Sequence, residues 1–217
     1  MKVKLINYSK YINDTENNLE FMVAYCARVS NPLNQLNNLN NEKLINYLIT
    51  HNHWSPFEMV SICLEINTSR DIARQMLRHR SFSFQEFSQR YAVVENDFIV
   101  REARLQDEKN RQNSIDTLDE NLKEEWNTIQ KRLNNEIYES YKWALDNGIA
   151  REQARSILPE GNTRSRLYMS GTLRSWIHYI ELRSGNGSQK EHVEIAVECA
   201  EVIKEIFPMI MNFVKVK

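Results

Sequence analysis

Residues 60–90 of the chain read VSICLEINTSRDIARQMLRHRSFSFQEFSQR and contain the two kinds of secondary structure on which the fold depends. Apolar and polar residues alternate from residue 60 to residue 67, which is the pattern of a half-buried strand. Residues 69–80 predict a helix, because Ser69 can cap the first turn and Asp71 places a negative charge in it. The apolar residues of this helix recur at helical spacing: Ile72, Ala73, Met76 and Leu77.

Strands are few in the rest of the chain. One is expected at residues 1–8 and another at residues 87–94, while residues 31–41 and 101–114 are polar and predict loops, the second of them a possible flap. Helices are expected in a short segment that ends at residue 51 and at residues 15–29, 149–158, 170–183 and 188–207. This pattern predicts a single α+β domain over residues 1–217, in which several long helices surround a small, mostly antiparallel sheet.

The longest helix is expected between residues 117 and 148. Thr117 and Glu120 have the spacing of a capping box, and Gly148 can end the helix. Between them, apolar residues recur along one face: Leu122, Trp126, Ile129, Leu133, Ile137, Tyr141 and Leu145.

The composition is that of a globular protein in a reducing compartment. The chain has 217 residues, of which 41% are hydrophobic and 26% charged, and its net charge is −1. No apolar run approaches the roughly 20 residues that span a bilayer, and the N-terminus lacks the apolar region of a signal peptide. Cys26, Cys63 and Cys199 are far apart, form no Cys-x-x-Cys motif, and have no activating base beside them. We therefore expect a cytoplasmic protein with neither a disulfide framework nor a membrane span.

The strongest indication of a binding site is the stretch from Arg78 to Arg90. It holds three arginines, one histidine, one glutamate and three serines within 13 residues. Residues 70–90 include five arginines and only two acidic residues. Since the net charge of the whole chain is close to zero, this positive charge is local and indicates a site. Gln75, Arg78 and His79 would share one face of a helix. Since the guanidinium group binds phosphates and carbonyl pairs bidentately, a polyanionic or nucleotide ligand is one interpretation and a solvated helix edge is the other.

Residues 51–58, His-Asn-His-Trp-Ser-Pro-Phe-Glu, form a second polar segment. His51, His53 and Glu58 do not have a recognised metal-binding spacing, so no metal site is predicted. Two interpretations remain open for this segment. It is either a polar loop with a packed tryptophan, or a loop whose histidine and hydroxyl line a ligand pocket.

Arginines also recur in the C-terminal half. Arg155 stands beside Ile157 and Leu158, which suggests partial burial, and its partner would be either a carboxylate or a bound anion. Arg174 and His178 lie one turn apart on a predicted helix. Arg183 lies at the end of that helix, where the helix dipole alone favours a cation.

Several classes of chemistry lack their motifs. Gly-x-Ser-x-Gly, a Walker loop and Gly-x-Gly-x-x-Gly are all absent from the sequence. A module that binds single-stranded nucleic acid is the competing class, because Phe82, Phe84, Phe87 and Tyr91 alternate with the arginines. The near-zero net charge and the lack of a second basic stripe argue against it.

The spacing within the arginine-rich stretch resembles a family signature. Arg78-His79-Arg80, followed after seven residues by Ser88-x-Arg90, resembles the signature of the flavin-dependent thymidylate synthases. The similarity covers nearly the whole chain, since three more segments resemble the family in the same order. These are His53-x-Ser55-x-x-Glu58, Ala154-Arg155-x-x-Leu158-Pro159 and Arg174-x-x-x-His178-x-x-x-x-Arg183.

The resemblance implies a reaction and a set of ligands. The family makes dTMP from dUMP, with methylenetetrahydrofolate as the carbon donor, FAD as the hydride carrier and NADPH as the reductant. Its members are homotetramers with FAD between subunits, on a fold of helices around a sheet. No nucleic-acid or membrane partner is implied.

The resemblance also implies which residues bind these ligands. Some relatives carry glycine where Gln89 stands and asparagine where His178 stands. The residues expected to hold dUMP are Gln75, Arg78, Glu86, Ser88, Gln89, Arg90, Arg155 and Arg183. The residues expected to bind FAD are His53, Ser55, Arg78, His79, Arg80, Glu86, Thr172, Arg174 and His178.

The family's catalytic arginine corresponds to Arg183. No cysteine follows a proline, so the cysteine route of the other thymidylate synthases has no candidate in this chain. A guanidinium stays protonated, and at the pyrimidine edge it would stabilise the negative charge that develops at N3 and O4. Ser88 has no partner base beside it and is expected to bind through its hydroxyl rather than to act as a nucleophile.

Overall fold

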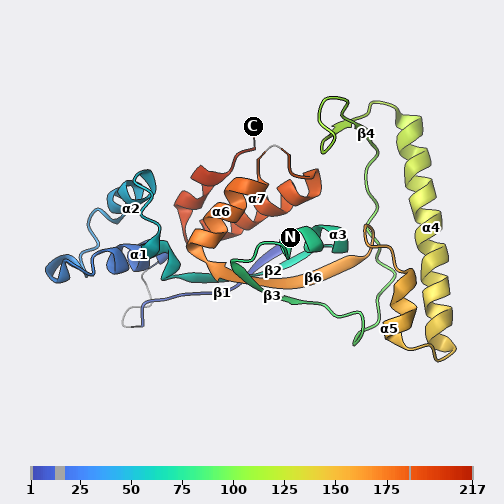
Figure 1. Ribbon diagram of the computed structural model, residues 1–217, viewed down its shortest axis with the longest axis horizontal. Helices are drawn as coiled ribbons and strands as arrows, with labels where there is room; N and C mark the ends of the chain where they lie inside the picture. Colours follow the sequence, from blue (N-terminus) through green and yellow to red (C-terminus); the bar gives the residue numbers. More distant parts are fainter. Residues whose placement is uncertain (1, 13–17, 186, 217) are drawn as a thin grey trace.

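The computed structural model describes residues 2–12, 18–185 and 187–216, and it is organised around one antiparallel sheet (Figure 1). Within these residues the sheet has four strands in the order β1-β2-β6-β3. All three pairings are antiparallel, which confirms the expected α+β class. The strands are β1 (Val3–Tyr8), β2 (Ser61–Ser69), β6 (Arg164–Thr172) and β3 (Phe82–Glu86).

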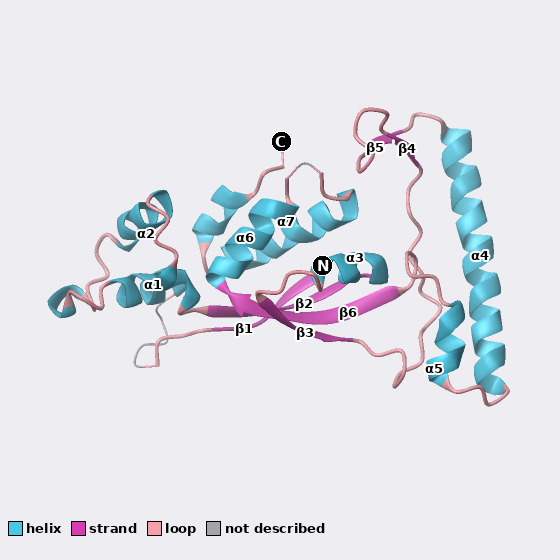
Figure 2. Ribbon diagram, viewed as in Figure 1, coloured by secondary structure: helices cyan, strands magenta, loops and turns pink. Residues whose placement is uncertain are grey.

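Helices cover one face of the sheet, and further helices lie beyond each of its two ends (Figure 2). Over the middle of the sheet lie α3 (Arg70–Met76), α6 (Leu173–Arg183) and α7 (Lys190–Lys204), followed by the 3-10 helix η4 (Pro208–Phe213). At one end lie α1 (Leu19–Ala27), η1 (Pro32–Asn34), α2 (Asn41–Thr50) and η2 (Ser55–Glu58). At the other end lie the β4–β5 hairpin (Arg104–Gln106 and Ser114–Asp116), α4 (Glu120–Asp146), α5 (Arg151–Ala154) and η3 (Arg155–Ile157).

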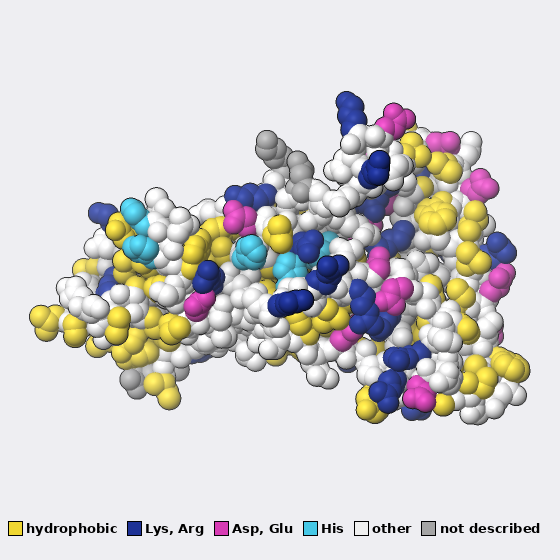
Figure 3. Space-filling model, viewed as in Figure 1, with side chains coloured by type: hydrophobic (Ala, Val, Ile, Leu, Met, Phe, Trp, Pro, Cys, Tyr) yellow, Lys and Arg dark blue, Asp and Glu magenta, His cyan; other side chains and the backbone are white. Residues whose placement is uncertain are grey.

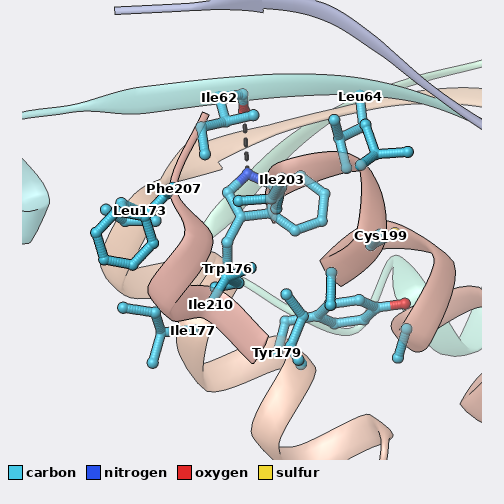
Figure 4. Packing of buried hydrophobic residues seen from close by; sticks show 14 of the residues in the cluster. Ile62, Leu64, Leu173, Trp176, Ile177, Tyr179, Cys199, Ile203, Phe207 and Ile210 are labelled. Atoms are coloured by element: carbon cyan, nitrogen blue, oxygen red, sulfur yellow. Dashed lines mark hydrogen bonds between the residues drawn. The ribbon is translucent and has the colours of Figure 1, made fainter. Parts of the chain in front are cut away.

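The main core lies between the sheet and helices α6 and α7 (Figure 4). Trp176 is fully buried there, and its indole Nε1 donates a hydrogen bond of 3.1 Å to the carbonyl of Ile62 on β2. Tyr179 is buried one turn further along α6. Cys199 lies in the same core, where burial raises the pKa of its thiol, so this cysteine is held as a neutral thiol.

Strand β6 is central to the sheet and was not predicted. It pairs with β2 on one side and β3 on the other, and it includes residues 170–172, which we had expected to begin a helix. That helix begins instead at Leu173, because Thr172 adopts an extended conformation and its hydroxyl accepts a hydrogen bond of 3.2 Å from the Ser175 amide.

The strand expected at residues 87–94 was wrong. The strand in this region is β3, at Phe82–Glu86. After Phe87 donates to the carbonyl of Arg166 (2.8 Å), the chain turns, because the amides of Tyr91 and Ala92 both bond to the carbonyl of Ser88.

Two predicted helix caps differ from those observed. Ser69 stands at the N-cap of α3, but its hydroxyl donates to the Asp71 carboxylate instead of capping the helix. Helix α4 is capped by Asp119, whose carboxylate accepts from the Leu122 amide at 3.0 Å, and not by Thr117. Helix α3 also ends at Met76 rather than at residue 80, so the residues that follow lie in a turn.

Other predicted boundaries are close to those observed. Gly148 follows α4 with a φ of +79°, a conformation that favours glycine. The polar segment 101–114, predicted as a loop, contributes strand β4 and the first residue of β5. Helix α1 begins at Leu19, and Asn18 caps it. Residues 1 and 15–17, which were included in the predicted first strand and first helix, lie outside the described residues.

Helix α4 buries its apolar stripe only near its C-terminal end. Tyr141 is fully buried in a small second cluster with Val94 and Ala154. By contrast, Trp126 is 41% exposed and Leu133 42% exposed. The described residues therefore cover the N-terminal half of the stripe only in part. No helix among the described residues has both the length and the apolar character needed to cross a membrane.

Candidate active site

The arginines near the signature divide into paired and unpaired side chains. Arg70 is buried between Glu86 (3.5 Å) and Glu160 (3.6 Å), and Arg74 contacts the same two carboxylates. The Ser165 hydroxyl donates to Glu86 at 2.6 Å. Within this chain, Glu86 therefore belongs to a structural ion-pair cluster that joins α3 to the sheet.

Four of the arginines expected in the site form an unpaired group, namely Arg78, Arg80, Arg155 and Arg183. None of them lies within 4.0 Å of a carboxylate among the residues that the structure describes. A guanidinium has five N–H donors, so each of these side chains retains donors for a ligand. Figure 3 shows cationic and histidine side chains gathered over the region of α3 and α6. Such a set suits an anionic ligand with several oxygen acceptors.

Of these four arginines, Arg183 contacts His79. Arg183 Nε donates to His79 Nε2 over 2.9 Å, so this imidazole nitrogen carries no proton. Burial, together with the charges of Arg183 and His178, lowers the pKa of His79 to about 4. The imidazole is consequently neutral near pH 7, and its ring packs edge-on against Tyr179 with the ring centroids 5.0 Å apart.

Gln75 connects this group to α7. Its amide nitrogen donates to Gln189 (2.9 Å), and its amide oxygen lies 3.0 Å from His192 Nδ1. His192 is fully buried and also contacts the hydroxyl of Tyr179 at 3.2 Å. Gln189 and His192 were not among the site residues predicted from the sequence. The available signal was a histidine on a helix face that is otherwise apolar.

The segment before β2 forms a second polar patch. Arg174, on the first turn of α6, pairs with Glu58 of η2 at 2.5 Å. Ser55 and His53 are exposed nearby in sequence, and Trp54 packs against Phe57 with the ring centroids 5.5 Å apart. The tryptophan is therefore packed, which is a feature of the first of the two interpretations of this segment.

No metal-binding arrangement occurs in this segment or elsewhere in the part of the chain that the structure describes. Among the described residues, no group of three or more His, Cys, Asp and Glu side chains could hold a metal ion.

Thr172 was expected among the FAD-binding residues. In the structure its hydroxyl caps helix α6.

A third patch follows β3. Arg90 lies 3.9 Å from Glu152 on α5, and Arg155 follows Glu152 by about one helical turn, so both arginines lie beside the same element. Gln89 is 5% exposed, and its Nε2 has no hydrogen-bond partner among the described residues. A buried amide without a partner is uncommon, so it is a candidate ligand contact. A cavity of about 440 Å³ borders Phe87 and Ser165 in this region.

The structure thus assembles the expected residues as three patches rather than one cleft. No hydrogen bond or ion pair between described side chains joins the Arg183 group to the patch that contains Arg90 and Arg155. Figure 1 places α5 beside α4 at one end of the molecule, whereas α6 lies over the middle of the sheet. Separate patches of this kind are what a site shared between subunits would present on each copy.

Comparisons with known proteins agree on the class of protein. The family described as thymidylate synthase complementing protein matches residues 4–209. A probable flavin-dependent thymidylate synthase of Paramecium bursaria Chlorella virus 1 is 51% identical over 97% of both chains. A flavin-dependent thymidylate synthase of Synechocystis is 50% identical over 88% of this chain and 87% of the relative.

A solved structure has the same architecture. The UMP/dUMP methylase PolB from Streptomyces cacaoi, bound with 5-Br UMP, superposes with a TM-score of 0.83 at 26% identity, over 99% of this chain and 95% of that chain. The fold and the arginine signature together define an enzyme of the thymidylate synthase complementing class. More specifically, the chain belongs to the flavin-dependent thymidylate synthase family. The predicted enzyme class and flavin cofactor are confirmed with it.

Proposed function

We propose that the protein methylates dUMP to dTMP, with 5,10-methylenetetrahydrofolate as the carbon donor and NADPH as the reductant of bound FAD. The observation that carries this proposal is that Arg78, Arg80, Arg155 and Arg183 form no ion pair among the described residues, whereas Arg70 and Arg74, in the same arginine-rich stretch as the signature, are ion-paired. Relatives about half identical over most of their length are named flavin-dependent thymidylate synthases. A structural relative is a UMP/dUMP methylase whose crystals contain 5-Br dUMP. The free cysteines suit the reducing cytoplasm in which we place the enzyme.

Arginines anchor the nucleotide in this proposal. Arg78, Arg90 and Arg155 bind the phosphate, and each hydrogen bond to a charged group contributes about 1.5–3 kcal/mol. Gln75 and the Ser88 hydroxyl add neutral contacts, and Gln89 contributes its backbone or its unpartnered amide. Glu86 orients Arg70 and Arg74 behind the site and is the remaining member of the expected dUMP set.

Arg183 is the catalytic residue of the proposal. Its hydrogen bond to His79 fixes the guanidinium, and its other N–H groups can face the N3 and O4 side of the pyrimidine. Negative charge developing there is stabilised by a group that needs no reorientation, which increases the nucleophilicity of C5. A neutral His79 supports this geometry, because a protonated ring could not accept from Arg183.

The flavin site fits the donors present. His53, Ser55, Arg80 and His178 are exposed, and Arg174 is oriented by Glu58. Bound FAD would supply the hydride transfer that no side chain can perform. The chain itself supplies phosphate and ring contacts from Arg78, His79 and the polar patch around η2. Thr172 caps helix α6, and Glu86 links strand β3 to Ser165 of β6, so both stabilise the elements around the site.

The proposed assembly is a homotetramer with FAD between subunits. Separate ligand patches on one chain support it, as does the exposed half of the α4 stripe. An apolar groove of about 730 Å³ between α4 and α5 adds further uncovered surface, lined among others by Trp143 and Ile157. Leu133→Glu should therefore dissociate the assembly, whereas Lys131→Glu, on an exposed polar position of the same helix, should not. Sedimentation velocity distinguishes these outcomes.

Purified protein tests the proposed reaction directly. It should be yellow and should form dTMP from dUMP only when methylenetetrahydrofolate and NADPH are both present. A colourless protein that takes up no added FAD would contradict the proposal, as would dTMP formation without folate.

A further inference from the structure

We propose that Glu191 and His192 are positioning residues that hold the amide of Gln75 in a single orientation, so that it presents one N–H and one oxygen lone pair to the nucleotide. This inference rests on the proposed function, in which Gln75 contacts dUMP. It concerns the first turn of α7, which the sequence motifs do not include.

A continuous series of hydrogen bonds links the two residues through Gln75. The Tyr179 hydroxyl lies 3.2 Å from His192 Nε2, and His192 Nδ1 lies 3.0 Å from Gln75 Oε1. Gln75 Nε2 lies 2.9 Å from Gln189 Oε1, and Gln189 Nε2 lies 2.9 Å from Glu191 Oε2. Five side chains from α3, α6 and the start of α7 are thereby connected.

The donor direction of the whole series follows from its last member. An ionised carboxylate can only accept, so Gln189 must direct its NH₂ group to Glu191 and its oxygen to Gln75. Gln75 must then donate to Gln189 through Nε2 and accept at Oε1. His192 consequently carries its proton on Nδ1, and the Tyr179 hydroxyl donates to Nε2. Rotating the Gln75 amide by 180° would place two oxygens together and two donors together.

Arginines fix the carboxylate that sets this direction. Arg104 Nη2 lies 2.5 Å and Arg101 Nη1 lies 3.0 Å from Glu191. Arg101 is itself held by Asp71 at 2.8 Å. Burial alone would raise the pKa of Glu191, but hydrogen bonds from Arg104 and the backbone, the charge of Arg101 and the Gln189 amide lower it to about 2. Glu191 is therefore an acceptor at any pH at which the enzyme would work.

His192 is suited to the role because it is neutral. Burial, followed by the charges of Arg183 and His79, lowers the pKa of His192 to about 3. A neutral imidazole has one donor and one acceptor, which match Gln75 and Tyr179. Gln75 keeps its second N–H and its second lone pair, and these are the groups available to a ligand.

Isosteric variants separate this role from simple packing. His192→Leu fills nearly the same space as His192→Asn but cannot donate, whereas the asparagine amide can occupy the Nδ1 position. The dissociation constant for dUMP, measured by calorimetry on the FAD-loaded protein, should rise roughly 2- to 10-fold in His192→Leu, which is the range expected for one neutral hydrogen bond. In His192→Asn it should stay within about twofold of wild type on the same scale.

A double-mutant cycle supplies the decisive readout. In a Gln75→Ala background, His192→Leu should have no further effect on dUMP affinity, because the group that it orients is gone. If His192→Leu does not fold, Gln189→Met, between Gln75 and the carboxylate end of the series, should give the same weakening. Ser188→Ala, one residue away and outside the series, is its control.

Different results would contradict the proposed function and the positioning role of Glu191 and His192. Wild-type protein that binds no dUMP would overturn the proposed function and this inference with it. If wild type binds dUMP while His192→Leu and Gln189→Met leave the affinity unchanged, or if His192→Leu acts equally with and without Gln75, only the inference is overturned.

Discussion

Arg183 donates a 2.9 Å hydrogen bond to a histidine 104 positions earlier in the chain, His79. The end of α6 and the turn after α3 are therefore joined through two residues that the family resemblance selects, His79 from the signature and Arg183 as the expected catalytic arginine. Since the guanidinium is always a donor, Nε2 of His79 must be the acceptor in this contact and carries no proton. In the catalytic role proposed for Arg183, a cation that is already oriented requires no rearrangement when charge develops on the substrate.

Arg183→Ala should retain FAD and lose dTMP formation. Loss of one preorganised donor to a developing charge typically lowers the rate by roughly 100-fold or more. Flavin absorbance and dTMP formation would be measured on the same preparation, with Glu181→Gln, an exposed neighbour on α6, as the control. Turnover near the wild-type rate in Arg183→Ala would show that the catalytic role is assigned to the wrong residue.

Glu86→Ala should destabilise the protein more than Glu58→Ala. The Glu86 side chain is 15% exposed and faces buried Arg70, whereas Glu58 pairs with an arginine that is half exposed. Removing one partner of a buried pair costs about 3–5 kcal/mol, while an exposed pair contributes about 0–1 kcal/mol. Urea unfolding at a fixed FAD concentration measures the free energy of unfolding of both variants. Equal losses would mean that the Arg70 cluster is solvated.

Gly171→Ala should weaken the pairing of β3 with β6. A Cβ atom at this position would lie 2.5 Å from Cδ1 of Phe82, a ring confined by Trp176 and Tyr179. We expect a loss of about 1–3 kcal/mol in the free energy of unfolding, as for other overpacked sites. Gly161→Ala, where nothing lies within 4 Å, is the matched control and should be close to neutral. A stable Gly171→Ala variant would contradict the close contact.

His192 should make the protein sensitive to acid. Its pKa is about 3 in the folded state against 6.5 in the unfolded chain, so below pH 6.5 the unfolded state binds the proton and stability falls with pH. Between pH 7.5 and pH 5 this amounts to about 2 kcal/mol. In His192→Asn the drop in unfolding free energy over that interval should be smaller by about this amount. An identical pH dependence in both proteins would contradict it.

The strand missed in the sequence explains why prediction of the fold was incomplete. Strand β6 alternates correctly, but Leu167 and Met169 are its only large apolar residues, and Arg164 and Arg166 alternate with them. Its position at the centre of the sheet comes from pairing with β2, where Leu64 faces Met169. Such pairing depends on residues about 100 positions away, and no local pattern contains it. The strand from Val60 onward was predictable because four large apolar residues alternate there.

The residues of the candidate site likewise divide into those that the sequence could identify and those that only the folded structure shows. Spacing alone could not separate Arg74 from Arg78, which both follow an arginine by four residues, although one contacts two glutamates and the other contacts no described carboxylate. The resemblance to the family identified Arg183 and the signature, because those residues recur at fixed distances in the sequence. It could not identify Gln189 or His192, whose proposed role rests on contacts made only in the folded chain.

The two separate apolar clusters imply that the molecule does not open as one unit. The large cluster beneath α6 and α7 should give its amides the slowest hydrogen exchange, whereas α4 and α5 are attached through the small Tyr141 cluster and a few polar links such as Gln130 with Arg101. An isolated subunit of the proposed tetramer would therefore lose protection in α4 first. Exchange in that helix would then report subunit association more sensitively than any probe in the sheet.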